Sequence, residues 1–90
     1  MTSQDFRDLL KEALIGLPLQ LRQQAVGVVT VIMFDPPPHG PRASLVAIVQ
    51  APNHLRLEVY KNNLDEGTKE AVLEKLKSAL ADEFNFYFDS

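Results

Sequence analysis

The sequence contains no cysteine. This absence excludes a disulfide framework, a thiolate metal site and a cysteine nucleophile, and it fits a protein of the reducing cytoplasm. Basic residues are also scarce, because 9 Lys and Arg stand against 12 Asp and Glu, which leaves a net charge of -3. No basic cluster interrupts this pattern, so we expect binding neither to nucleic acid nor to an anionic membrane.

Long apolar runs and glycine-rich loops are missing as well. The longest apolar stretch, around "VVTVIMF", is too short to span a bilayer. The first residues, "MTSQDFRDLL", are polar and acidic, unlike a signal peptide. The 4 glycines are scattered, so no phosphate-binding loop is formed. These features predict a cytoplasmic protein.

What the chain does contain is enough apolar material for one domain over residues 1–90. Its 46% hydrophobic residues allow a real core. Residues 3–18 show the apolar spacing of a helix buried on one face, which Gly16 and Pro18 end, with Thr2 or Ser3 as the N-cap. A short further turn of helix follows Pro18.

Three stretches predict strands. Residues 26–34 are β-branched and apolar on both faces, which suits a central strand covered on both sides. Residues 43–50 form a second strand after the proline loop at 35–41. Residues 54–60 alternate cleanly, which indicates a half-exposed strand in an antiparallel hairpin with the second.

A last helix is predicted from about Gly67 to the mid-eighties, after a loop at 61–67 and with Asp65 or Thr68 as its cap. The fold class is therefore α+β: a helix, a three- or four-stranded mostly antiparallel sheet, and a C-terminal helix. The predicted core comprises Phe6, Leu10, Leu14, Val28, Val31, Leu57, Val59, Leu76, Leu80 and Phe84.

Four stretches, in this order and spacing, resemble the minimal zincin-like metallopeptidases, small bacterial proteins with a zinc-binding HExxH helix near the C-terminus. They are "FRDLLKEALIGLP", "VVTVIMFDPPP", "APNHLRLEVYKNNL" and "VLEKLKSALADEFNFYFD", and they cover most of the chain. The resemblance implies the α+β fold described above. It also implies a zinc site on the last helix.

The metal motif itself departs from the family. Asp82 stands where the first zinc-binding histidine is expected, and Glu83 occupies the position of the general base. Phe86, which has no lone pair for zinc, replaces the second histidine. We therefore expect no bound metal and a silent Glu83, and the resemblance then implies a pseudoenzyme that acts as a binding or interaction module. The alternative is an active metallopeptidase with unusual ligands, which needs His39 or His54 to approach the helix.

The aromatic residues after the motif suggest a second role. Helical geometry places Phe84, Tyr87 and Phe88 near the core face, and Phe86 toward its edge. One helix cannot bury all of them against a small sheet, so we expect the Phe86 and Tyr87 side to contact a protein partner, most simply in a two-fold homodimer. Plain core packing of these side chains is the alternative.

Overall fold

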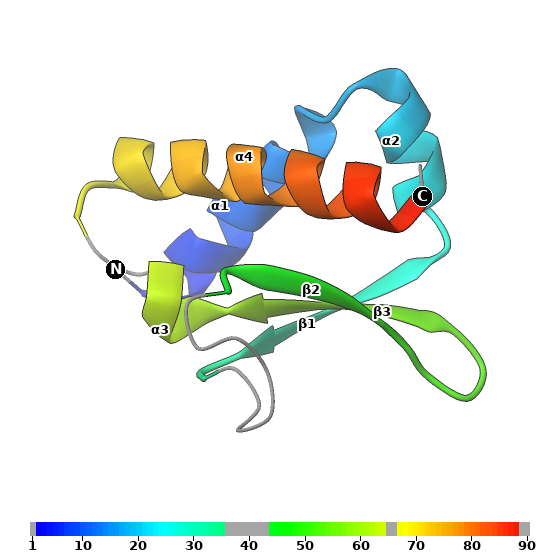
Figure 1. Cartoon of the computed structure of the whole chain (residues 1–90). Helices are drawn as coiled ribbons and strands as arrows, with labels where there is room; N and C mark the ends of the chain where they lie inside the picture. Colours follow the sequence, from blue (N-terminus) through cyan, green and yellow to red (C-terminus); the bar gives the residue numbers. More distant parts are fainter. Residues whose placement is uncertain (1, 36–43, 65–66, 89–90) are drawn as a thin grey trace.

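The computed structural model describes residues 2–35, 44–64 and 67–88, and within them it has four helices and three strands. This arrangement confirms the predicted α+β class. In chain order the elements are α1 (Ser3–Ile15), α2 (Leu19–Ala25), β1 (Val28–Met33), β2 (Val46–Gln50), β3 (Leu55–Tyr60), α3 (Lys61–Leu64) and α4 (Lys69–Phe88) (Figure 1). The proline loop, including His39, lies largely outside the described residues.

The three strands form one mixed sheet in the order β1-β3-β2. β2 and β3 pair as the predicted antiparallel hairpin, with Ile48 opposite Leu57. β1 runs parallel to β3, with Val28 beside Leu55 and Met33 beside Tyr60. The sheet thus has one antiparallel and one parallel pair, and β3 lies at its centre.

This order reverses the predicted roles of two strands. The first strand was expected at the centre, but β1 is an edge strand and Val29 is 50% exposed. The third strand was expected to be half-exposed, but β3 is central, and Glu58 and Tyr60 are each only 3% exposed. The physical reason is that burial in a sheet depends on neighbours on both sides, which alternation along one strand does not report.

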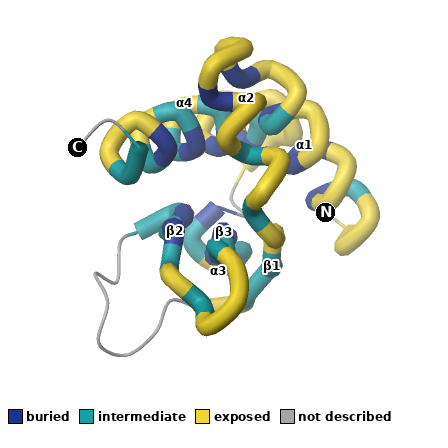
Figure 2. Tube along the Cα trace, turned by 90° about the vertical axis from the view of Figure 1, so that its right-hand side faces the viewer, coloured by how far each residue is buried: buried dark blue, intermediate teal, exposed yellow. Residues whose placement is uncertain are grey.

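The helices gather on one side of the sheet. Figure 2 shows α4 above β2 and α1 above β1, with β3 between the two strands. α1 and α4 also pack against each other, so the apolar faces of both helices and of the sheet enclose one core. The fully buried large side chains are Phe6, Leu57, Val59, Leu64, Val72, Leu76, Leu80 and Phe84.

Most of the predicted core is confirmed. Leu10 is also buried, while Leu14 and Val28 are partly buried and pack against the core. Val31 differs, because it lies beside Glu58 on the face of the sheet that points away from the helices, and it is only half-buried there. The loop expected at 61–67 contains one turn of helix, α3, which brings Leu64 into the core.

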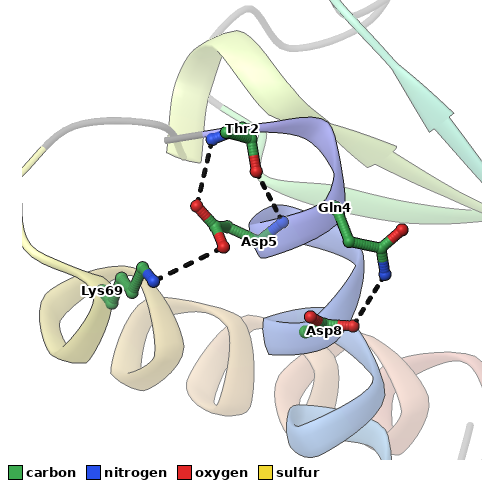
Figure 3. A network of polar contacts seen from close by, with 5 residues as sticks. All are labelled: Thr2, Gln4, Asp5, Asp8 and Lys69. Carbon is green, nitrogen blue, oxygen red and sulfur yellow. Dashed lines mark hydrogen bonds and ion pairs between the residues drawn. The ribbon is translucent and has the colours of Figure 1, made fainter.

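Both long helices begin with side-chain caps. The Thr2 hydroxyl accepts the Asp5 N–H at 3.1 Å and the Asp5 carboxylate accepts the Thr2 N–H at 3.3 Å, which is a capping box (Figure 3). The Thr2 bonds, with Lys69 at 3.4 Å, hold the pKa of Asp5 below its ordinary value. Thr68 caps α4 by accepting the Ala71 N–H at 3.2 Å. The Lys69–Asp5 ion pair therefore joins the starts of the two helices.

Candidate functional site

The helix that carries the motif residues, α4, lies along the outer edge of β2. Val72, Leu76 and Leu80 hold it on the core, as the predicted apolar spacing requires. Glu83 and Tyr87, one turn apart, lie on the flank of the helix that meets β2. This placement decides which atoms the motif residues contact.

The Glu83 carboxylate is bound to the backbone of β2, because its Oε1 accepts the Ile48 N–H at 3.0 Å. The Tyr60 N–H donates to the Leu45 carbonyl at 2.9 Å, so Leu45 and every second residue after it bond to β3. Ile48 falls in the other set, and its N–H points to the open side of the sheet. Glu83 therefore satisfies a donor that an edge strand would otherwise leave to water.

Tyr87 makes the next contact along the same line. Its hydroxyl lies 3.4 Å from Oε1 of Gln50, two residues beyond Ile48. Four residues of helix rise about 6 Å, and two residues of strand rise about 6.6 Å, so the two contacts match in spacing. The flank of α4 is thus held in register with β2 at two points.

The remaining motif residues point elsewhere. Asp82 is exposed, and Phe86 is 75% exposed, while Phe84 is fully buried and Tyr87 and Phe88 are half-buried. The prediction that at least one of these aromatic residues lies off the core face is confirmed by Phe86. A contact between the Phe86 and Tyr87 side and a second chain stays a prediction.

The donors at the motif positions do not fit a zinc site. Phe86 offers no lone pair, and an oxygen of Glu83 is already used by the Ile48 N–H. His54 is exposed at the turn before β3. In residues 2–35, 44–64 and 67–88 no three side chains of the His, Cys, Asp or Glu type are grouped closely enough to hold one metal ion.

Sequence reasoning missed a buried polar cluster on the other face of the sheet. The Glu58 carboxylate, 3% exposed, accepts bonds from Arg56 Nη2 at 2.7 Å and from the Tyr60 hydroxyl at 2.9 Å. The alternation of β3 did predict that these three side chains share a face. The central position of β3 explains why Glu58 and Tyr60 are buried on this face, while the Arg56 side chain stays 43% exposed.

This cluster changes the acidity of Tyr60. Burial of the phenol, then the hydrogen bond to Glu58 and its negative charge, raise the pKa of Tyr60 to about 12. The charge of Glu83 adds to this effect, and Arg56 opposes it. Tyr60 is therefore a hydrogen-bond donor at neutral pH. The bonds of Tyr60 and Arg56 to Glu58 tie side chains of the central strand together, while Arg56 Nε is buried without a hydrogen-bond partner among the described residues.

The comparisons with known proteins add no family to this description. A scan against protein-family models matches none, and a search of the curated proteins finds no similar chain. The resemblance to the minimal zincins thus stays a prediction from the four stretches. None of the helices in the described residues combines the length and the hydropathy needed to cross a membrane.

Proposed function

We propose that this chain is a zincin-like protein that has lost its zinc ligands and works as a cytoplasmic binding module, not as a peptidase. The observation that carries the proposal is the hydrogen bond from the Ile48 N–H to the Glu83 carboxylate at 3.0 Å. It gives the one retained residue of the motif a structural task. The neighbouring motif positions offer little to replace the lost chemistry.

The chemical argument concerns what a general base must face. In a zinc peptidase the glutamate takes a proton from water that the metal has acidified. Here an oxygen of Glu83 is turned to the backbone of β2. The side chain in the position of the second ligand, Phe86, is a hydrocarbon ring that is 75% exposed. Both observations favour binding over catalysis.

The exposed ring also supports a place for binding. A phenyl ring that stays 75% exposed on a small domain is apolar area that a second chain would cover. We propose that the Phe86 and Tyr87 side of α4 contacts a protein partner, with a two-fold homodimer as the simplest case. Neither nucleic acid nor membrane is proposed, since the chain is acidic with a net charge of -3.

The test measures metal and cleavage on the same preparation. We expect elemental analysis of protein purified without chelator to find far less than one zinc per chain, and a mixed peptide library to stay intact. Stoichiometric zinc, with chelator-sensitive cleavage that Glu83→Gln abolishes and Asp82→Asn alters, would establish the alternative of an active metallopeptidase. In that case a His39→Ala or His54→Ala variant would identify the extra ligand.

A further inference from the structure

The two edges of the sheet are not equivalent. The outer edge of β2 faces α4, and its Ile48 N–H donates a hydrogen bond to the Glu83 carboxylate. The outer edge of β1 has no such cover, since no hydrogen bond joins it to any residue in the described part of the chain. Every second N–H and C=O of β1 points away from β3, as in any edge strand. Among the described residues, β1 therefore offers a row of unpaired backbone groups.

A groove runs beside this open edge, between β1 and α1. It has a volume of about 600 Å³, and its walls include Leu10, Leu14 and the edge residues Thr30 to Ile32. A smaller hollow of about 140 Å³, lined by Phe34 and Lys61, continues it along the strand. Residues of α1 form one side of the groove and residues of the β1 edge form the other. Figure 2 shows α1 above the β1 side of the sheet, so we call the α1 side the roof.

The roof of the groove is positively charged. Arg7 lines both parts of the groove and Lys11 lines the larger part, and both are exposed. Neither forms an ion pair with any residue that the structure describes. The neighbouring acid Asp5 is paired with Lys69, and Asp8 accepts a bond from Gln4 (Figure 3). Arg7 and Lys11 are the charged side chains among those that line the larger part of the groove, so the charge that faces its interior is positive.

We propose that the β1 edge groove binds an extended acidic peptide segment of a partner protein, which adds a fourth strand to the sheet. The backbone of the segment pairs with the open edge of β1, and its carboxylates meet Arg7 and Lys11. These two residues are four apart on α1, about 6 Å along the helix, which matches alternate residues of a strand at about 6.6 Å. Acids at positions i and i+2, followed by an apolar residue near Leu14, fit this row.

The charges favour such a peptide over a second copy of this chain. If β1 paired with β1 of another copy, the Arg7 and Lys11 side chains of both copies would face the same junction. These like charges would repel each other, which disfavours pairing of two copies, whereas the carboxylates of an acidic peptide would be attracted to them. The proposal rests on the proposed binding function, to which it adds a partner. The two can fail separately, because metal content and peptide cleavage test the loss of peptidase activity, whereas peptide binding tests the groove.

The experiment uses the full chain and the heptapeptide TETETLT, capped at both ends, in an NMR titration of the backbone amides. We expect saturable shifts in residues 28–33 and 7–14, with little change at β2 and α4. Raising the salt concentration weakens the binding, because the ion pairs are near the surface. The peptide TKTKTLT is expected to bind at least tenfold more weakly. N-methylation of alternate residues of TETETLT abolishes binding in one of the two possible sets, since only one set faces β1.

Charge reversal gives the sharpest variant. We expect R7E together with K11E to weaken TETETLT binding by about tenfold and to favour TKTKTLT instead. The matched control, R22E together with K75E, makes the same change in net charge outside the groove and leaves binding unchanged. Where the charge-reversed chain fails to fold, R7Q with K11Q replaces it, with loss of the preference between the two peptides.

Three outcomes overturn the proposal. The first is the absence of saturable shifts up to millimolar peptide. The second is binding with shifts confined to β2, α4 or the far face of the sheet. The third is a chain that dimerises through β1 in sedimentation and excludes the peptide, which would make a second copy the occupant of the groove.

Discussion

Removal of the Glu83 carboxylate is expected to destabilise the fold, because the Ile48 N–H loses its acceptor. A hydrogen bond to a charged group contributes roughly 1.5–3 kcal/mol. Glu83 is only half-buried, so water replaces part of the bond, and we expect the lower end, about 1.5 kcal/mol, for Glu83→Ala. In a domain of this size that loss lowers the melting temperature by roughly 6–12 °C.

The assay is thermal and urea unfolding followed by circular dichroism. Glu83→Gln keeps an oxygen acceptor without the charge, so its loss is expected to be about half that of Glu83→Ala. Asp82→Ala removes the same charge from the adjacent, exposed position and should stay within about 0.5 kcal/mol of the wild type. If Glu83→Ala unfolds like Asp82→Ala, the bond to β2 contributes nothing and the structural role of Glu83 is refuted.

Four further predictions concern Tyr60, Phe86 and Thr2. The folded chain holds the Tyr60 proton more tightly than the unfolded chain, because its pKa is raised to about 12. The free energy of unfolding, measured by urea titration, should therefore be constant below about pH 10 and fall by about 2 kcal/mol between pH 10 and pH 12. The Tyr60→Phe variant should not show this decrease. In a Tyr87→Phe background, ultraviolet absorbance should follow Tyr60 as the sole tyrosine and show its pKa near 12; titration near 10 would contradict the buried network. Phe86→Ser is expected to convert a dimer to a monomer in sedimentation without unfolding it, and a wild type that is monomeric at high concentration would exclude the homodimer. Thr2→Ala removes a capping box and should cost about 1 kcal/mol in urea unfolding, whereas Thr2→Ser should cost almost nothing.

Local patterns predicted α1, α2 and α4 and which side chains of the two long helices are buried, but not the single turn of α3. The spacing of Leu76, Leu80 and Phe84 indicated a buried face, and all three are fully buried. The same helical geometry separated Phe84 from Phe86, which is 75% exposed. These predictions hold because the hydrogen bonds within a helix fix its geometry, and this geometry alone decides which residues share a face.

The order of the strands was beyond such patterns. β1 is apolar on both faces, which favoured the centre of the sheet, yet it lies at an edge with Val29 half exposed. Glu58 reads as a polar residue on an exposed face, yet it is buried because β1 and β2 flank it. Strand order is decided by pairings between distant segments, and alternation within one strand carries no information about them.

The same limit applies to the motif on α4. From the sequence, Glu83 is the remnant of a catalytic pattern, and its partner is invisible because Ile48 lies 35 residues earlier in the chain. The spatial arrangement supplies a reason for a carboxylate at this position that requires neither metal nor substrate. A glutamine there would still accept the Ile48 N–H, but with a weaker, uncharged bond.

The structural role of Glu83 and the proposed peptide groove both concern an edge of the sheet, and both edges pose the same physical problem. An edge strand exposes unpaired backbone groups, and a protein either covers them or makes them selective. At β2, Glu83 and the flank of α4 cover the edge. At β1 no described residue pairs with the outer edge of the strand, and Arg7 and Lys11 of α1 line the groove beside it. Cations in that position oppose pairing with another copy and favour an acidic strand, so the open edge is selective rather than merely uncovered.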